Sequence, residues 1–449
     1  MVLSRRPLPW SVPERLSRGL VQAGPVLVVI VVAAAVAGAA AWAHVPAKLG
    51  FHGGFVDLSA YRYGGRLVLD GLPLYGSRDP ATNLGFTYPP FAAVAMALLA
   101  VLPVWLAAAL WTAASVAALA GVIAVAARAM HRLVPGRIVA LLTVGAFALE
   151  PVWQNLTFGQ INLLLMFAVF IDLVRPAGRW SGVLVGVAAG VKLTPLVFVV
   201  LLVLVGRHRT AIRALAAFAG TVVIGLVTVP AAAQAYWTDN LIKAGRVGPP
   251  ELAHNQSVFG ALTRMLDSPA PTLLWLAVAG PLALAVVGVG AVCWRRGDRV
   301  LGTGLAALAM LLASPVSWSH HWVWAVPVGL ALWERSRWMS ALWTAVFVVR
   351  PFAWLPAGDG REYRWHSIEH VPGDVYLLTA LALTAWVAMR LHRPARHAGS
   401  GRPEAANAAG PPGVSSSRPE SRDQWCDNGD ATSASREGSE PVIGPSRPV

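Results

Sequence analysis

Long apolar stretches separated by short arginine clusters dominate the chain. The first stretch runs without a charged side chain from residue 19 to residue 46, directly after an arginine-rich segment at residues 1–18. The apolar core of a signal peptide is only about 7–15 residues long, so this stretch predicts a retained membrane helix. Because basic residues flank the cytoplasmic ends of membrane helices, residues 1–18 are predicted to be cytoplasmic.

Further basic clusters recur between the later apolar runs. They are Arg128/Arg132/Arg137, Arg175/Arg179, Arg207/Arg209/Arg213, Arg295/Arg296/Arg299, Arg335/Arg337 and Arg390/Arg393/Arg396. If all of these clusters are cytoplasmic, an even number of crossings must separate each neighbouring pair of clusters. Paired apolar runs provide two crossings each at 138–151 with 160–174, 214–231 with 271–294, 300–316 with 322–334, and 338–356 with 375–391. The pattern predicts an all-α polytopic membrane protein with about twelve crossings and a cytoplasmic C-terminus.

Two segments do not fit a simple series of straight spans. Residues 88–127 must cross once yet are apolar throughout, so 88–104 is predicted to be a re-entrant or interfacial helix before a span at 105–127. Residues 180–206 carry Lys192 in mid-run. Each half, about 12 residues long, reaches only about 18 Å at 1.5 Å per residue. Broken helices of this kind are tolerated where they line a cavity.

Composition supports a membrane protein, because 56% of the residues are hydrophobic and only 13% are charged. The net charge of +14 lies in the clusters between apolar runs and not on a basic face with interleaved aromatics, so no nucleic-acid partner is expected. Cys293 and Cys426 lie too far apart in sequence to suggest a disulfide framework. Residues 398–449 are poor in apolar side chains and are predicted to be a disordered cytoplasmic tail behind a membrane domain at 19–397.

The polar residues that suggest chemistry fall on the non-cytoplasmic side of this topology. Asp57 lies in the first external loop, residues 44–104, and precedes Leu-Ser-Ala-Tyr. An aspartate there is either a helix N-cap or a functional carboxylate, and the residues alone favour neither. Gln160 and Asn162 open a later span, where amides bind hydroxyl-rich ligands or join helices.

Cationic and imidazole side chains supply candidate partners for an anion. Lys192 lies at membrane depth and is expected to face a cavity, a phosphate or a buried carboxylate. His320 and His321 are adjacent, and metal ligation, hydrogen bonding to phosphate or sugar, and a structural role all remain open. Arg246 lies between glycine and valine in the external segment 232–269 and is either a phosphate ligand or a solvated loop residue.

Asn255 and Gln256 belong to the same external segment. The Asn255-Gln256-Ser257 triplet matches a glycosylation acceptor, a short pattern with a high rate of chance matches. The two amides are also candidates for hydrogen bonds to a sugar substrate. The triplet alone does not decide between these uses.

Six motifs occur in an order and spacing that resemble glycosyltransferase family 87, the polyprenol-phosphate-mannose-dependent α-1,2-mannosyltransferases. They span roughly residues 50–335 and are Phe55-Val56-Asp57-Leu58, Phe86-Thr87-Tyr88-Pro89-Pro90-Phe91, Gly159-Gln160-Ile161-Asn162, Gly190-Val191-Lys192-Leu193-Thr194-Pro195, Asn255-Gln256-Ser257 and Ser314-Pro315-Val316-Ser317-Trp318-Ser319-His320-His321-Trp322. The segment around 236–257 looks most like the phosphatidylinositol-mannoside branch.

The resemblance implies a C-type glycosyltransferase fold with interfacial helices in the first external loop and Asp57 as the catalytic aspartate. It implies a polyprenyl phosphate sugar donor, a glycolipid acceptor, and an active site facing outward from the plasma membrane, with neither metal nor cofactor required. Donor phosphate or substrate contacts are then expected from Lys192, His320, His321, Arg246, Gln160, Asn162, Tyr88, Asn255 and Gln256. A related enzyme using another lipid-linked sugar such as arabinofuranose, and a lipid-linked sugar transporter, remain alternatives.

Overall fold

The computed structural model describes residues 14–42, 54–242 and 247–392. Every regular element in these ranges is helical, apart from isolated bridges pairing Arg78 with Gly85 and Asn255 with Trp318. The predicted tail at 398–449 and most of the predicted N-terminal segment lie outside the described residues. The described part of the chain is therefore all-α, as the apolar pattern predicts.

The longer helices match the predicted spans in position. Five are long and apolar enough to cross a membrane, or six if a bent pair forms one span. The five are α1 (Glu14–Trp42), α4 (Val104–Ala129), α10 (His208–Thr228), α13 (Thr272–Arg295) and α18 (Val375–His392). These helices make the chain a multi-pass membrane protein, and the count of twelve crossings stays a prediction.

Shorter helices occupy the remaining apolar runs. They are α3 (Pro90–Ala100), α5 (Gly136–Ala146), α6 (Glu150–Phe158), α7 (Asn162–Val174), α8 (Val183–Val191), α9 (Val197–Leu204), α14 (Arg299–Ala313), α15 (Ala325–Trp333) and α16 (Arg337–Val349). The run predicted as one crossing at 138–151 is instead divided between α5 and α6, which meet at 84°. Pro151 lies in the first turn of α6, where its missing N–H breaks no helical bond.

The helix predicted to break near Lys192 does so. α8 ends at Val191, Lys192 is extended, with φ −147° and ψ 125°, and the 3₁₀ turn η2 (Thr194–Leu196) leads into α9. A proline in η2 cannot donate the hydrogen bond that a continuous helix would need there. The break leaves the lysine at the junction of two short helices.

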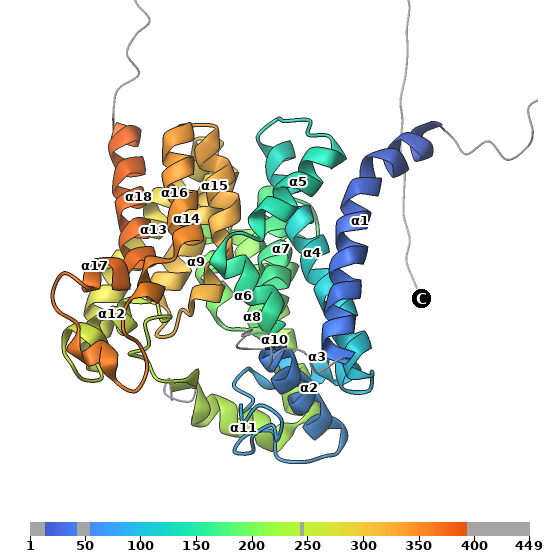
Figure 1. The fold of residues 1–449 in the computed structure, drawn as a ribbon, viewed down its shortest axis with the longest axis vertical. Helices are drawn as coiled ribbons and strands as arrows, with labels where there is room; N and C mark the ends of the chain where they lie inside the picture. The colour runs from blue at the N-terminus through green and yellow to red at the C-terminus, as the bar shows by residue number, and fades with distance from the viewer. Residues whose placement is uncertain (1–13, 43–53, 243–246, 393–449) are drawn as a thin grey trace, which may run out of the picture. The chain divides into compact units, whose positions relative to one another are not determined.

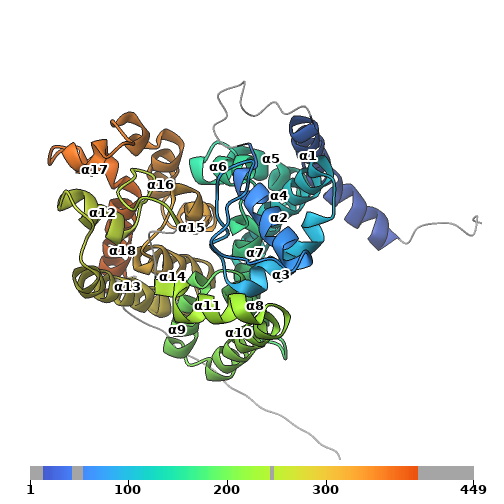
Figure 2. The same ribbon diagram turned by 90° about the horizontal axis from the view of Figure 1, so that it is seen from below.

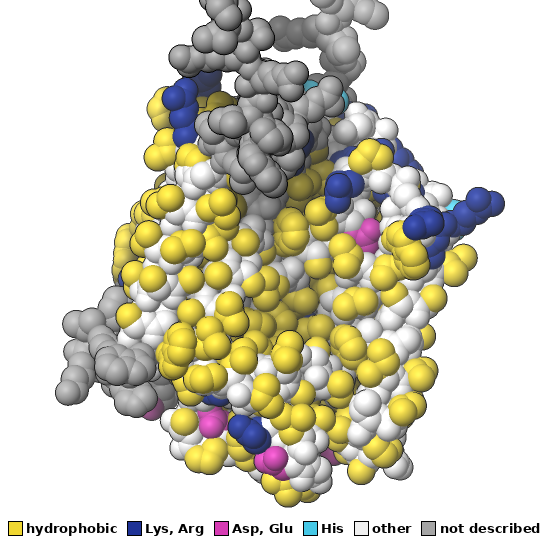
Figure 3. Space-filling model, turned by 90° about the vertical axis from the view of Figure 1, so that its right-hand side faces the viewer, with side chains coloured by type: hydrophobic (Ala, Val, Ile, Leu, Met, Phe, Trp, Pro, Cys, Tyr) yellow, Lys and Arg dark blue, Asp and Glu magenta, His cyan; other side chains and the backbone are white. Residues whose placement is uncertain are grey.

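Described arginines of several clusters meet at one end of the helices, which we call the basic end and which lies at the top of Figure 1. Arg132 pairs with Glu334 at 2.7 Å, and Arg296 donates to the Leu391 carbonyl at 3.0 Å. Clusters that the charge pattern assigned to one side of the membrane are therefore joined in space. In Figure 3, hydrophobic side chains cover the middle of the face drawn, and charged ones gather toward its two ends.

The opposite end, which we call the site end, carries several short helices. It holds α2 (Val56–Leu69), α3, α11 (Pro230–Thr238), α12 (Val258–Met265) and α17 (His370–Gly373), with the 3₁₀ turns η3 (Asn240–Ile242), η5 (Ser319–Trp324), η6 (Pro351–Trp354) and η7 (Arg361–Arg364) nearby. Figure 2, viewed from this end, shows α2 beside α3, which pack against each other. Arg62 of α2 donates to the carbonyls of Leu99 (3.0 Å) and Leu102, so it caps the end of α3.

Candidate active site

Asp57 lies in the first turn of α2 at the site end. The helix begins at Val56, and its N-cap is Phe55, whose left-handed backbone (φ 58°, ψ 30°) carries no side-chain capping bond. The alternative that Asp57 is an N-cap is therefore wrong. The Phe55 N–H donates to the Thr157 carbonyl at 2.8 Å, which ties the start of α2 to α6.

Gly159 allows α6 to approach α2 this closely. Its φ of +67° ends α6 in the left-handed conformation, and an added Cβ would lie 2.7 Å from Leu58 Cβ and 3.1 Å from Phe55 Cδ1. Only glycine meets both conditions without displacing α2. The next residue, Gln160, is thereby placed beside Asp57.

A network of amide and phenol groups surrounds the Asp57 carboxylate. The Gln160 side chain hydrogen-bonds to Asp57, while its Oε1 accepts from Tyr61 Oη at 2.8 Å and from Tyr88 Oη at 3.4 Å. Because Oε1 is engaged as an acceptor, the Gln160 NH₂ group must be the donor to Asp57. Asn162 Nδ2 also reaches Gln160 Oε1, at 3.3 Å.

Lys192 completes this network from the break between α8 and α9. Its Nζ donates to Asn162 Oδ1 at 2.9 Å and lies 3.0 Å from His321 Nε2. It also lies 5.8 Å from the centre of the Tyr88 ring. An ammonium group has three N–H donors, so one remains for a ligand beyond these two contacts.

The two histidines have different surroundings. His321 is partly exposed and faces Lys192, whereas His320 is buried against Phe158, with ring centres 5.6 Å apart. The His320 carbonyl accepts from Asn162 Nδ2 at 3.3 Å and from Asn155. The backbone of His320 therefore anchors η5, the turn that carries His321.

Exposure divides the residues of this network into two groups. Asp57, Tyr88, Lys192 and His321 are partly exposed. The supporting side chains are buried, namely Tyr61, Gln160, Asn162 and His320. Asn162, Lys192 and His321 also line an open cavity, together with Thr194, Ser314 and Ser317 and with apolar side chains of α7, α9 and α14. Its lining therefore combines polar groups with apolar side chains.

Asn255 and Gln256 do not join this site. Both side chains are fully buried and bind the protein's own backbone. Gln256 Nε2 donates to the Gly373 carbonyl at 2.6 Å, and Asn255 Oδ1 accepts from the Ser317 N–H at 2.9 Å. They hold the loop before His320 in place and leave no surface for a sugar or a glycan. Arg246 lies outside the described residues.

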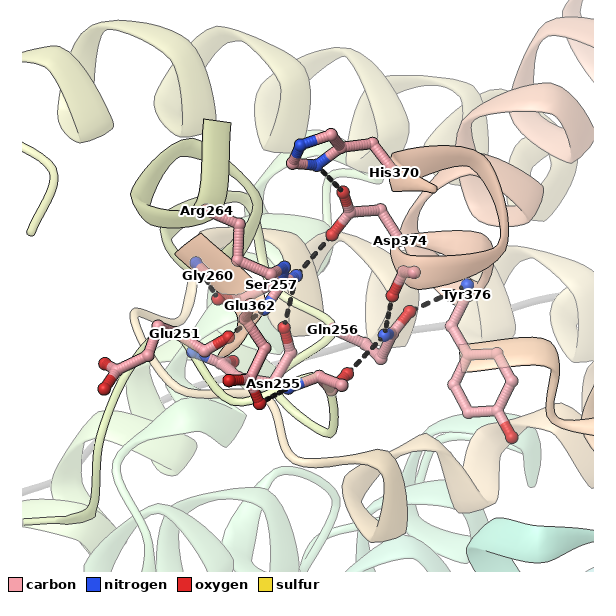
Figure 4. A network of polar contacts seen from close by, with 12 residues as sticks. Glu251, Asn255, Gln256, Ser257, Gly260, Arg264, Glu362, His370, Asp374 and Tyr376 are labelled. Atoms are coloured by element: carbon pink, nitrogen blue, oxygen red, sulfur yellow. Dashed lines mark hydrogen bonds and ion pairs between the residues drawn. The ribbon is translucent and has the colours of Figure 1, made fainter. Parts of the chain in front are cut away.

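A buried ion pair anchors the same loop, as Figure 4 shows. Arg264 of α12 is fully buried, pairs with Asp374, and donates to the carbonyls of Glu251, Leu252 and Asn255, each at 3.0 Å. Both terminal nitrogens of the buried guanidinium are thereby satisfied, although its Nε has no hydrogen-bond partner. Although burial alone raises the pKa of Asp374, the charge of Arg264 and the nearby His370 lower it overall.

The electrostatic state of Asp57 follows from its position. Burial raises its pKa to about 6, and the hydrogen bond from Gln160 and the charge of Lys192 act in the opposite direction. A carboxylate in this state is ionised at pH 7 and more basic than an exposed aspartate. It is suited to take a proton from a substrate hydroxyl.

We expect Gly159→Ala to reduce activity at least tenfold and to lower the unfolding temperature. The left-handed conformation alone costs a non-glycine residue about 1–2 kcal/mol, and the new methyl group would also push α2 and Asp57 away. Gly71→Ala is the matched control, because Gly71 has φ +65° but no atom near the added Cβ. Thermal unfolding and transfer assays of both purified variants measure the difference. Equal losses in the two variants would contradict a role for the α6–α2 contact.

The model of glycosyltransferase family 87 matches residues 86–315 of the chain. A polyprenol-phosphate-mannose-dependent alpha-(1-2)-phosphatidylinositol pentamannoside mannosyltransferase of Mycobacterium tuberculosis (strain CDC 1551 / Oshkosh) is 37% identical over 365 residues, covering 74% of this chain and 81% of the relative. A protein of the same description from Mycolicibacterium smegmatis is 33% identical over 365 residues, with 74% and 85% covered.

A third relative, a polyprenol-phosphate-mannose-dependent alpha-(1-2)-phosphatidylinositol mannoside mannosyltransferase of Mycobacterium tuberculosis (strain ATCC 25618 / H37Rv), is 34% identical over 327 residues. These residues are 67% of this chain and 76% of the relative. No solved structure matches the chain significantly. The family match and the coverage of these relatives agree with the six motifs, and the chain belongs to glycosyltransferase family 87.

Proposed function

We propose that the protein transfers mannose from a polyprenyl phosphate donor to a mannosylated phosphatidylinositol and forms an α-1,2 linkage. The observation that carries this proposal is the continuous hydrogen-bonded series from Asp57 through Gln160 and Asn162 to Lys192. It places a basic carboxylate and a cation at opposite ends of one network. The relatives are named for a polyprenyl phosphate donor, whose phosphate suits the Lys192 cation, and for a mannoside acceptor, whose hydroxyl suits the Asp57 carboxylate.

Asp57 acts as the general base in the proposed reaction. It takes the proton from an acceptor hydroxyl while that oxygen attacks the anomeric carbon of the donor mannose. The new C–O bond forms as the bond from the anomeric carbon to the phosphate oxygen breaks. A single displacement inverts the anomeric centre, so a β-linked donor gives an α-linked product without a covalent enzyme intermediate.

The leaving polyprenyl phosphate departs as an anion, and Lys192 stabilises its growing charge. Fixed donors aimed at developing charge are effective in a site that excludes water. His321 and Asn162 hold the ammonium group in position through the two contacts described above. The apolar walls of the adjacent cavity accept the start of the lipid tail.

The proposed site opens on the non-cytoplasmic face of the plasma membrane. Asp57 and Lys192 lie toward the site end, opposite the basic end, and basic clusters mark the cytoplasmic side of membrane proteins. Both termini are then cytoplasmic, and the chain crosses the membrane about twelve times. The interfacial helices α2 and α3 of the first external loop agree with a C-type glycosyltransferase fold.

The pH dependence of transfer tests the role of Asp57. The base must be ionised, so kcat/KM is expected to fall about tenfold per pH unit below about 6. Lys192 lowers the pKa of Asp57, so the residual activity of Lys192→Gln should fall off at a higher pH than wild type. An unshifted profile in that variant would contradict the proposed coupling of the two residues.

Two alternatives predict different products. Membranes containing the protein are incubated with labelled polyprenyl phosphate mannose or polyprenyl phosphate arabinofuranose and a phosphatidylinositol mannoside. Label from the mannose donor alone is expected in the glycolipid. Label from the arabinofuranose donor would indicate the related enzyme class, and movement of intact donor across vesicles without transfer would indicate a transporter.

A further inference from the structure

A second polar cluster lies at the site end and reaches η5 through Ser319, two residues before His321, which Lys192 contacts. Its core is Glu150, which is buried and accepts from Ser319 Oγ at 2.6 Å and from Tyr376 Oη at 3.1 Å. Ser319 in turn lies 3.2 Å from Nδ1 of His254, which is exposed. The cluster thus runs from a buried carboxylate to a side chain at the surface.

While Glu150 is ionised, the direction of these hydrogen bonds fixes the tautomer of His254. Ser319 has one hydroxyl proton and donates it to Glu150, so it accepts from His254 Nδ1–H. Partial burial and the charge of Arg350 lower the pKa of His254 despite the opposing charge of Glu362, so the ring is neutral at pH 7. Its Nε2 is then an acceptor, suited to a hydroxyl group and not to a phosphate oxygen.

Arg350 provides the cation of this cluster. It is exposed and lies between α16 and η6, two residues before Phe352. The Phe352 ring packs against His254, with centres 5.0 Å apart, and against Tyr376, with centres 5.2 Å apart. Arg350 therefore lies on the short turn that borders both ends of the cluster.

The backbone of Arg350 makes this position unusual. It has φ 45° and ψ 62°, the left-handed conformation, at the C-terminal end of α16. Helices usually place glycine at such a position, because other residues are strained there. An arginine at this position carries a backbone cost, which favours a function for its side chain.

The acceptor lipid has a charge that the site around Asp57 does not accommodate. Its phosphodiester is separated from the reacting mannose by the inositol and intervening sugars, whereas Lys192 is in the same network as Asp57 and is used by the donor. A second anion site is therefore needed at a distance from the reacting hydroxyl. Hydroxyl acceptors beside that site would suit inositol or mannose.

We propose that Arg350 binds the phosphodiester of the acceptor glycolipid and that His254 accepts a hydrogen bond from one of its neighbouring hydroxyl groups. This inference rests on the proposed function and specifies where the headgroup of the acceptor binds. η5 then contacts the surroundings of both anion sites, through His321 beside Lys192 and through Ser319 in the cluster beside Arg350. The Glu150 carboxylate holds His254 in the required tautomer through Ser319.

The test measures acceptor binding without donor, so it does not depend on transfer. Arg350→Gly removes the side chain and suits the left-handed backbone. We expect it to weaken binding of phosphatidylinositol mannoside at least tenfold, as for loss of a charge-assisted hydrogen bond. Binding of a neutral alkyl mannoside should change less than twofold. Arg350→Lys should retain part of the affinity, and Arg364→Gln, an exposed arginine of η7, is the matched control.

A structural role for Arg350 gives a different result. If the arginine only balances the charge of Glu150, the effect of Arg350→Gly should vanish in a Glu150→Gln background, whereas phosphodiester binding predicts the same fold loss in both. Equal weakening for the charged and neutral acceptors, or no weakening in Arg350→Gly, would overturn the assignment. Normal acceptor binding by a wild-type protein that transfers no mannose would instead count against the proposed function alone.

Discussion

Replacing Asp57 with Asn or Ala is expected to reduce mannosyl transfer by at least about 10²–10⁴-fold, the usual contribution of a positioned general base. Asparagine has the same shape and can still accept a hydrogen bond from Gln160, so the network should persist while the basic group is lost. Transfer of label from purified donor to glycolipid measures the effect in membranes with equal amounts of each variant.

Asp70 supplies the control for this experiment. It is an exposed carboxylate at the other end of the same helix, so Asp70→Asn should leave transfer within about twofold of wild type, because surface substitutions have small effects. Substantial transfer by Asp57→Ala membranes would falsify the assignment of Asp57. Equal losses in Asp57→Asn and Asp70→Asn would point to a general effect of negative charge on α2.

Replacing Lys192 with Gln is expected to give the second-largest loss, about 10²–10³-fold in kcat, as for removal of one fixed donor to a developing anion. The amide of glutamine can still donate to Asn162, so the network loses charge more than it loses structure. The KM for the polyprenyl phosphate donor should rise, while the KM for the acceptor should change little.

Lys192→Arg separates the effect of the charge of the side chain from the effect of its shape. Arginine keeps the charge but replaces a compact ammonium group with a planar fork that does not fit between Asn162 and His321. Partial recovery of donor affinity with a low kcat is expected. If Lys192→Gln raised both KM values by the same factor, the lysine would have a general structural role and the phosphate assignment would be wrong.

Much of the helical framework is predictable from the apolar pattern, and the reason is physical. Lipid replaces water around each span, so apolar runs and basic flanks identify helices directly. The break at Lys192 is also predictable, because a lysine beside a proline suits neither lipid nor a continuous helix. The bend between α5 and α6 is harder to predict, because neither the apolar run at 138–151 nor Pro151 determines an angle of 84°.

The site is only partly predictable. Asp57, Lys192 and Gln160 are identified by their motifs, but the contacts of Asp57 with Gln160 and of Lys192 with His321 join residues more than a hundred positions apart in the sequence. Tyr61 was missed, although it lies one helical turn after Asp57 and such neighbours share a face. Asn255 and Gln256 were predicted to contact substrate and instead bind backbone, because a polar side chain in sequence does not reveal whether its partner is a ligand or the chain itself.

Arg264 shows that a buried structural role can also be hidden in the sequence. It lies in a short helix and resembles an ordinary surface arginine in the sequence, yet it is fully buried against Asp374 and three carbonyls. The signal that could have identified it is the neighbouring loop, whose carbonyls need donors once the loop is buried. Pairing of α12 with the start of α18 must be known before that need becomes visible.

The linkage of the product tests the proposed reaction most directly. Purified protein is given polyprenyl phosphate mannose labelled at the anomeric carbon together with a phosphatidylinositol mannoside, and the product is analysed by NMR spectroscopy. We predict one new mannose, α-linked to O2 of the terminal mannose, formed by wild type and by Asp70→Asn but not by Asp57→Asn. Retention of the donor's β configuration, or equal product from Asp57→Asn, would contradict a single displacement with Asp57 as base.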